Sequence, residues 1–273
     1  MNLSGIIGYS FLSKNGKKII IFSDAHSEVE YCKEDYIKIS NLFKSLIKND
    51  KYQILLEEVD RRNIELNELW PKSEHIQNLK KLYLNNKDHI IPIDIRPFLY
   101  KFSWEFILDE KFKEYGKIKF SDYLENLDNF FNLESDKIEF NKNIKKLINN
   151  SIYVKNINNN YINLKTAYLK FKERNKFFLN KKLIEIYNSD NNIFNMLDEL
   201  LSSIMEWYSI VLMLSSSKIS VIHLGLFHSR EIVYSLINNY KFDLIEENGI
   251  TKYPSKNLRS CVLLSKKMIK NLN

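Results

Sequence analysis

Cysteine is scarce in this chain, whose 273 residues contain only Cys32 and Cys261. Two cysteines make no disulfide framework, and these two lack the paired spacing of zinc ligands. Because structural disulfides are rare in reducing compartments, a reducing compartment fits this cysteine usage. We therefore expect no disulfide framework and a cytoplasmic location.

Targeting and membrane-spanning segments are also missing from the sequence pattern. The N-terminal residues lack a basic region followed by an apolar core, which is the pattern of a signal peptide. The most apolar helical stretch, residues 193–214, contains Asp198, Glu199 and Glu206. Charges at those depths argue against a membrane span. We expect neither a signal peptide nor a transmembrane helix.

The chain lacks a recognisable nucleic-acid motif, although its net charge is +7 and its pI is about 9.0. Such a charge suits an acidic partner such as nucleic acid. The lysines are nevertheless scattered, and many lie beside acidic residues, as in 111–119. A lysine-rich solvated surface explains the charge, while a nucleic-acid binder is an alternative based on charge alone.

Alternating strand and helix patterns fill the first hundred residues. Asn15-Gly16 lies between two apolar runs and is a strong hairpin signal, since both turn residues must tolerate positive φ. Helical spacing of apolar residues then alternates with short apolar runs. This order favours a largely parallel sheet covered by helices. The predicted strands are 4–11, 18–23, 52–56 and 90–95, and the predicted helices are 36–47 and a segment starting near Ser73.

The middle of the chain is helical, and the sheet resumes after it. We predict helices at 123–133, 138–148, 164–187 and 193–214, and loops at the Asn-rich stretches 156–160 and 188–192. Later strands are predicted at 220–224, 242–246 and 260–265. The fold class is therefore α/β, with a mixed, largely parallel sheet flanked by helices. Residues 1–101 and 218–273 form the two parts of the core, and residues 102–217 form a helical insertion that is a candidate lid.

Three of the five histidines lie in two short segments that each follow an apolar run. Asp24 and His26 follow the first run. His223 lies in the second run, and Gly225 and His228 follow it. In open α/β sheets, ligands bind at the carboxyl ends of the strands. Both segments are thus candidate parts of one site.

Two further predicted strands end in charged residues. Glu57 and Glu58 follow one apolar run, and Asp94 and Arg96 follow the next. Carboxylates and imidazoles gathered at one sheet edge can hold a divalent metal, or transfer protons to and from water without one. A guanidinium group suits an anionic substrate or a developing oxyanion.

Each of these candidates has a plainer explanation. His26 can cap the next segment, and the adjacent glutamates can begin a solvated loop, although two carboxylates after an apolar run are costly unless they are paired or exposed. Asp94 and Arg96 can simply pair with each other.

The other histidines are expected to have structural or surface positions. His223 lies within an apolar run, so we expect a hydrogen-bonded core histidine. His75 and His89 lie in polar surroundings, and we expect both at the surface.

The motif Gly225-Leu226-Phe227-His228 matches the Gly-x-x-His motif of the TraB/TIKI group, which is similar to the erythromycin-esterase and ChaN-like proteins. Ser23-Asp24-Ala25-His26 resembles the first histidine motif of that superfamily, with Ser in place of the glycine. Leu55-Leu56-Glu57 resembles the family feature of a glutamate that ends the next strand. The long helical insertion between the two motifs also fits.

The resemblance implies an α/β core and a hydrolase, sometimes metal-dependent, that acts on an ester or peptide bond. The substrate would be a small molecule or a peptide, and the metal Mn, Co or Zn. His26, Glu57 and His228 would activate water or hold the metal, with Glu58 as a further catalytic candidate. Asp94, Arg96, Asp24 and Gly225 would bind or orient the substrate. Nothing in the sequence indicates the oligomeric state.

Two alternatives stay open. Asp24-Ala25-His26 also resembles the opening Asp-x-His of calcineurin-like metallophosphoesterases, but their Gly-Asp-x-x-Asp, Gly-Asn-His and Gly-His-x-His segments are missing from the sequence. The lost first glycine also suggests a catalytically inactive binding protein that retains the fold.

Overall fold

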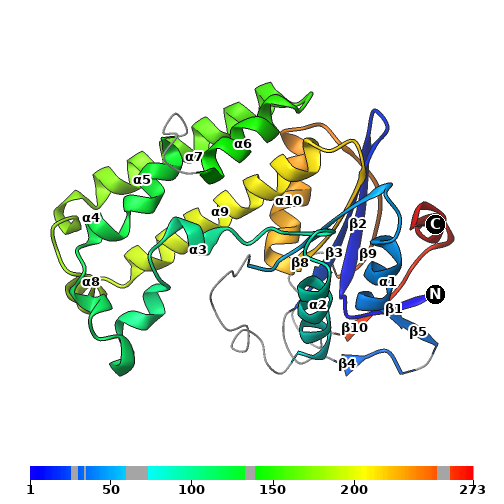
Figure 1. The fold of residues 1–273 in the computed structure, drawn as a ribbon, viewed down its shortest axis with the longest axis horizontal. Helices are drawn as coiled ribbons and strands as arrows, with labels where there is room; N and C mark the ends of the chain where they lie inside the picture. Colours follow the sequence, from blue (N-terminus) through cyan, green and yellow to red (C-terminus); the bar gives the residue numbers. More distant parts are fainter. Residues whose placement is uncertain (26–29, 34, 60–72, 133–138, 251–258, 273) are drawn as a thin grey trace. The chain divides into compact units, whose positions relative to one another are not determined.

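The computed structural model describes residues 1–25, 30–33, 35–59, 73–132, 139–250 and 259–272, and its fold class is α/β, as predicted (Figure 1). The chain divides into two compact units. The sheet unit comprises Met1–Asp94 and Ser216–Asn273, and the helical unit comprises Ile95–Ser215. The helical unit therefore interrupts the sheet unit, with its boundaries after residues 94 and 215.

A six-stranded sheet forms the centre of the sheet unit, in the order β7-β6-β8-β3-β2-β9. Neighbouring strands from β7 to β3 are parallel, whereas β2 is antiparallel to both β3 and β9. The predicted, largely parallel sheet is confirmed. Its strands are β2 (Gly8–Lys14), β3 (Lys17–Asp24), β6 (Tyr52–Leu56), β7 (Ile90–Pro92), β8 (Ile219–Gly225) and β9 (Asp243–Gly249).

A tight hairpin joins β2 to β3 at the predicted position. Lys14 pairs with Lys17, which leaves a two-residue turn. Both turn residues have positive φ, 49° at Asn15 and 82° at Gly16. Asn and Gly are the residues that tolerate this conformation, so the local sequence fixes the turn and the register of the hairpin.

The two faces of the six-stranded sheet are covered by different helices. Alternate residues of a strand point to opposite faces. Phe22, Ile54 and Val221 belong to a core that also includes residues of α1 (Ile39–Leu46), α2 (Glu74–Asn85) and α11 (Lys266–Leu272); we call this side the α2 face. On the opposite side, the α10 face, α10 (Leu226–Asn238) packs against β3 and β8.

A second sheet of four short strands was not predicted. Its order is β4 (Glu30–Tyr31), β10 (Arg259–Leu263), β1 (Asn2–Ser4) and β5 (Tyr36–Lys38). The strand expected at 260–265 thus pairs with β1 and β4 rather than continuing the main sheet. An apolar run identifies a strand, but it does not identify the partner of that strand.

This small sheet also corrects the expectation for the cysteines. Ser260 pairs with Tyr31, so the next residues, Cys261 and Cys32, lie side by side. Their Cα atoms are 5.0 Å apart, and they form a disulfide that spans 229 positions of the sequence. Strand pairing between distant segments creates this bond, which is why cysteine spacing did not reveal it.

The helical unit contains seven α-helices and four short 3-10 segments in its described part. The predicted loop at 156–160 is wrong, because these residues lie inside α7. Ile157, Tyr168 and Phe171 recur at helical spacing and are buried, so packing overrides the low helix propensity of asparagine. The helix predicted at 164–187 ends at Arg174, and a separate helix starts at Leu183.

The helices of this unit are α3 (Arg96–Leu99), α4 (Phe120–Tyr123), α5 (Glu125–Phe131), α6 (Glu139–Asn149), α7 (Val154–Arg174), α8 (Leu183–Ser189) and α9 (Asn192–Leu214). The short α4 continues almost directly into α5. The 3-10 segments are η1 (Trp104–Ile107), η2 (Glu110–Phe112), η3 (Tyr115–Lys117) and η4 (Lys176–Phe178). Among the described helices, none combines the length and apolar character needed to cross a membrane.

Candidate functional site

The candidate residues of the sheet unit gather at one edge of the six-stranded sheet. Asp24 at the end of β3 pairs with Gly225 at the end of β8, and Leu56 at the end of β6 pairs with His223. Parallel strands therefore bring their carboxyl ends together, as expected. Side-chain alternation then separates the polar groups into two clusters, one on each face of this edge.

The first cluster lies on the α10 face and consists of Glu57 and His228. The Oε2 atom of Glu57 accepts a hydrogen bond of 2.7 Å from the backbone N–H of Gly225. The Oε1 atom lies 3.6 Å from Nε2 of His228. Only 9% of the Glu57 side chain and 10% of the His228 side chain are exposed. We call this arrangement the Glu57–His228 pair.

The Gly-x-x-His spacing explains how the pair forms. Gly225 ends β8 and is the N-cap of α10, and His228 lies three residues later. Three residues are almost one helical turn, so the histidine lies on the same side of the helix as the capping glycine. The Gly225 N–H and the positive end of the helix dipole both favour a charged carboxylate at Glu57.

The Glu57–His228 pair has the chemistry of a proton-transfer site. The 3.6 Å separation is longer than a hydrogen bond. Catalytic contacts are often long without substrate and shorten in the reacting complex. A carboxylate and an imidazole at this distance can therefore act on the same water molecule or substrate group.

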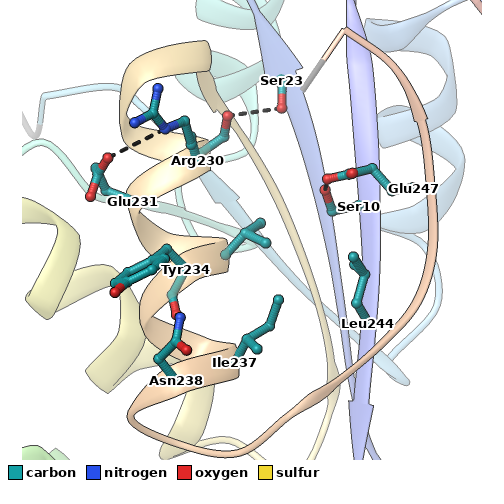
Figure 2. Close-up of a pocket in the computed structure, with 11 residues that line it drawn as sticks. Ser10, Ser23, Arg230, Glu231, Tyr234, Ile237, Asn238, Leu244 and Glu247 are labelled. Atoms are coloured by element: carbon teal, nitrogen blue, oxygen red, sulfur yellow. Dashed lines mark hydrogen bonds and ion pairs between the residues drawn. The ribbon is translucent and has the colours of Figure 1, made fainter. Parts of the chain in front are cut away.

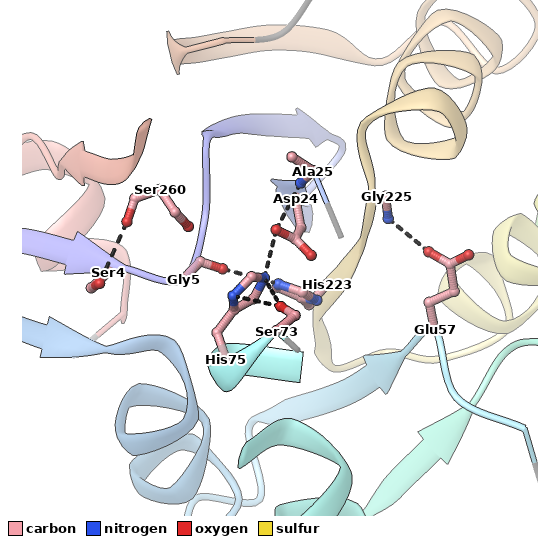
Figure 3. A network of polar contacts seen from close by, with 10 residues as sticks. All are labelled: Ser4, Gly5, Asp24, Ala25, Glu57, Ser73, His75, His223, Gly225 and Ser260. Atoms are coloured by element: carbon pink, nitrogen blue, oxygen red, sulfur yellow. Dashed lines mark hydrogen bonds and ion pairs between the residues drawn. The ribbon is translucent and has the colours of Figure 1, made fainter. Parts of the chain in front are cut away.

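The second cluster lies on the α2 face and is more deeply buried. Asp24 is fully buried, and its Oδ1 atom lies 2.7 Å from Nε2 of His75. The same oxygen accepts a hydrogen bond of 2.7 Å from the backbone N–H of Ala25. The Ser73 hydroxyl lies 3.1 Å from Nδ1 of His75 (Figure 3). We call this arrangement the Asp24–His75 pair.

The burial of His75 corrects the expectation of a surface residue. Its exposed fraction is 5%. The histidine lies in the first turn of α2, and Leu79 and Leu82 of the same helix are also buried. The spacing of four and seven residues from His75 to these leucines was the signal that placed it on the inner side of the helix. The polar neighbours in sequence hid that signal.

His223 is a core histidine, as predicted. It is 2% exposed, and its Nε2 atom lies 3.3 Å from the carbonyl oxygen of Gly5. Gly5 has a φ of +96°, and a Cβ atom there would lie 2.6 Å from Cγ2 of Ile39. The positive φ and the close approach of Ile39 therefore require glycine at this position. His89 is exposed, in agreement with the sequence analysis.

A small cavity of about 190 Å³ borders His75 on the α2 face. Its lining includes Lys38 and Glu74, which form an ion pair of 2.6 Å. The hydrogen bond from Lys38 is the main cause that lowers the pKa of the Glu74 carboxyl. Glu74 thus stays ionised next to the cavity.

The remaining candidates are divided between the two units. His26 lies outside the described residues. Glu58 is buried, and its carbonyl oxygen accepts a hydrogen bond of 3.1 Å from the backbone N–H of Asp94. Arg96 is the first residue of α3 in the helical unit. In that unit, burial raises the pKa of the Asp198 carboxyl, and the positive charge of Arg96 opposes that shift.

The proposed metal ligands include one residue that the structure does not describe. Glu57 and His228 are close together, and the third, His26, lies outside the described ranges. Within those ranges, no group of three or more His, Cys, Asp and Glu residues has a geometry suited to a metal ion.

A groove of about 670 Å³ lies between α10 and the β2, β3 and β9 strands (Figure 2). At one end, the hydroxyls of Ser23 and Ser229 are 2.8 Å apart. Ser23 precedes Asp24, and Ser229 follows His228, so this end of the groove lies at the same sheet edge. The groove is lined by Ser10, Ser23, Ser229, Arg230, Glu231, Val233, Tyr234, Ile237, Asn238, Leu244 and Glu247. The sequence did not predict this groove, because its lining comes from four separate elements and consists of residue types that are common on protein surfaces.

No protein-family model, curated protein or solved structure matches this chain.

Proposed function

We propose that this protein is a hydrolase in which Glu57 and His228 activate water for attack on an ester or peptide bond. The supporting observation is the position of the Glu57 carboxylate, held by the Gly225 N–H and 3.6 Å from the His228 ring. These three residues are also those that resemble the TraB/TIKI and erythromycin-esterase pattern. The proposal therefore joins a short sequence motif to a local geometry.

The two side chains have different roles in this proposal. Glu57 is hydrogen-bonded as a carboxylate and accepts a proton from the attacking water. His228 then donates a proton to the leaving group. Proton transfer by a positioned side chain contributes roughly 10²- to 10⁴-fold to a rate, so each residue has a measurable share of the activity.

The groove beside α10 would receive the apolar part of the substrate. Val233, Tyr234, Ile237 and Leu244 give it an apolar lining, and Ser23 and Ser229 lie at its polar end. Its volume of about 670 Å³ falls in the range of small-molecule sites. A substrate that lies along the groove would reach the Glu57–His228 pair around the N-terminus of α10.

A divalent metal, Mn, Co or Zn, is the alternative arrangement that the family resemblance implies, in which Glu57 and His228 hold the ion instead of transferring protons themselves. Glu57 and His228 would supply two of its ligands and His26 the third. When bound, such an ion lowers the pKa of a coordinated water molecule. Elemental analysis of the purified protein, with His228→Ala as the comparison, tests this part separately from activity.

The test of the proposed function is a screen of ester, peptide and phosphodiester substrates, with and without added Mn²⁺, Co²⁺ or Zn²⁺. Wild-type protein is compared with His228→Ala and with a control, His89→Ala, at an exposed histidine. We expect the wild type and the control to cleave an ester or peptide, and His228→Ala to lose that activity. Equal turnover in all three proteins would refute the role of His228.

A catalytically inactive binding protein is the second candidate function, and it rests on Ser23. The side chain of this residue replaces the family glycine and contacts Ser229 at the end of the groove. Substrate binding without turnover in the screen would favour this candidate. Turnover of phosphodiesters alone would instead favour a phosphoesterase.

The Cys32–Cys261 disulfide bears on the proposed location. Disulfides are rare in the cytoplasm and persist in oxidising compartments, so this bond argues against the cytoplasmic location expected from the sequence. Thiol labelling of the protein in acid-quenched native cells shows whether the two cysteines are free thiols or form the disulfide. Two labelled cysteines would restore the cytoplasmic proposal, and unlabelled cysteines would exclude it.

A further inference from the structure

The net charge of the chain is concentrated in one short segment. Residues 151–182 contain eight of the 41 basic residues and one of the 34 acidic residues. The rest of the chain therefore contains 33 residues of each sign, and the net charge of +7 belongs to this segment. The lysines are thus less evenly scattered than the sequence analysis supposed.

Most of this segment forms α7, which has a buried side and an exposed side. Ile157, Tyr168 and Phe171 are buried within the helical unit. Lys155, Lys165, Lys170 and Arg174 are exposed. We call these four residues, with the apolar side chains described next, the α7 basic face.

Nearby acidic groups offset only part of this charge. Glu173, the acidic residue of the segment, forms an ion pair of 2.6 Å with Lys176. Asp128 of α5 forms an ion pair of 2.7 Å with Lys172 on the flank of the helix. Both acids are thus paired with lysines other than the four that define the α7 basic face. A third acidic residue, Glu199 of α9, lines a pocket with Lys170 and Arg174 and offsets part of their charge.

Large apolar side chains project from the same surface. Ile162 is 57% exposed and Leu169 is 54% exposed. They are seven residues apart, so they lie on the same side of the helix, between Lys165 and Lys170. Phe177, just after the helix, is 79% exposed. Exposed apolar residues flanked by lysines are the pattern of a helix that lies in a membrane interface.

We propose that the α7 basic face binds the surface of a bilayer containing anionic lipids. The lysines and Arg174 would contact the headgroups, and Ile162, Leu169 and Phe177 would enter the interface. The apolar side chains favour this partner over nucleic acid, because phosphate contacts use cations and gain nothing from exposed aliphatic groups. The proposal concerns peripheral attachment and is independent of the hydrolase proposal.

The test is flotation of the full-length protein with phosphatidylcholine vesicles, prepared with and without phosphatidylglycerol, at low and high salt. We expect binding only to the anionic vesicles, and weaker binding at high salt. A triple variant, Lys165→Gln, Lys170→Gln and Arg174→Gln, should reduce the partition coefficient about 100-fold, at about fivefold for each charge. A matched control, Lys44→Gln, Lys48→Gln and Lys267→Gln, changes exposed lysines elsewhere and should bind as the wild type does.

A second variant distinguishes membrane binding from nucleic-acid binding. Ile162→Ser with Leu169→Ser leaves every charge in place and should weaken vesicle binding at least tenfold, because about 0.8 kcal/mol is lost for each CH₂ group removed from the interface. Circular dichroism checks that both variants keep their helix content. Equal loss of binding in the two triple variants would overturn the proposal. So would duplex DNA or RNA binding in place of vesicle binding.

Discussion

Two acid–imidazole pairs lie at the same edge of one sheet, and their surroundings differ. The Asp24–His75 pair is separated by 2.7 Å, with side-chain exposures of 0% and 4%. The Glu57–His228 pair is separated by 3.6 Å, with exposures of 9% and 10%. The first pair is on the α2 face and closed off from solvent, while the second is on the α10 face and still reaches it. Identical chemical groups therefore suit different tasks.

The contacts of the two pairs support this division. The Asp24 carboxylate accepts a hydrogen bond from the Ala25 N–H and contacts the His75 ring. The Ser73 hydroxyl contacts the same ring. These contacts fix the end of β3. One oxygen of the Glu57 carboxylate accepts a hydrogen bond from the Gly225 N–H, and the other oxygen lies 3.6 Å from His228. We infer that the Asp24–His75 pair stabilises the sheet edge and that the Glu57–His228 pair performs chemistry.

The largest expected effect is the loss of activity when the Glu57–His228 pair is broken. Glu57→Gln keeps an oxygen for the Gly225 N–H but cannot accept a proton from water. We expect kcat to fall roughly 10²- to 10⁴-fold, while the free energy of unfolding falls by less than about 2 kcal/mol, the scale of one hydrogen bond to a charged group. Steady-state kinetics and urea unfolding of the same preparation measure both. Full activity in this variant would assign the chemistry elsewhere.

The Asp24–His75 pair should show the opposite balance. Asp24→Ala removes the carboxylate that contacts the buried His75 ring and should lower the free energy of unfolding by about 3–5 kcal/mol. The control, Asp50→Ala, removes an exposed carboxylate and should change stability by less than about 0.5 kcal/mol. Urea unfolding compares the two variants. Similar stability in both would mean that the buried pair contributes little to the fold.

Reduction of the Cys32–Cys261 disulfide should act on the Asp24–His75 side. The small sheet carries β1, which leads to Gly5 and its contact with His223. We expect reductant to lower the free energy of unfolding by about 2–4 kcal/mol and to leave kcat nearly unchanged below the unfolding temperature. A Cys32→Ser, Cys261→Ser variant provides the control, since reductant should not alter it. A reductant effect in that variant would point to another cause.

The smallest expected effect concerns the groove beside α10. Ile237→Trp would fill part of the groove without touching either pair, so we expect KM to rise about tenfold, or ~1.4 kcal/mol of binding, with little change in kcat. The same change at an exposed site of the small sheet, Leu263→Trp, is the control. A fall in kcat without a change in KM would show that the groove does not bind the substrate.

Local signals account for the parts of the fold that the sequence predicted. Asn15-Gly16 defines its hairpin without help from distant residues, and apolar runs locate the parallel strands. Pairing between distant segments was not predictable, as Cys32 and Cys261 show. The loop predicted at the asparagine-rich start of α7 was wrong for a related reason, because buried residues farther along the helix decide its structure.

The same limit applies to the candidate site. Glu57 and His228 follow apolar runs and were found by that position. The face that each residue occupies depends on how the strands pair and on which side of the sheet its side chain points to. The sequence shows neither. His75 was misjudged because its polar neighbours were weighed more heavily than its helical spacing to Leu79 and Leu82.

The most direct test of a working Glu57–His228 pair is a double-mutant cycle on kcat/KM with Glu57→Gln and His228→Ala. If the two residues act as a unit, the double variant loses no more activity than the more damaged single variant. If they act separately, the two losses multiply. We predict the first result, and multiplication of the losses would contradict the account.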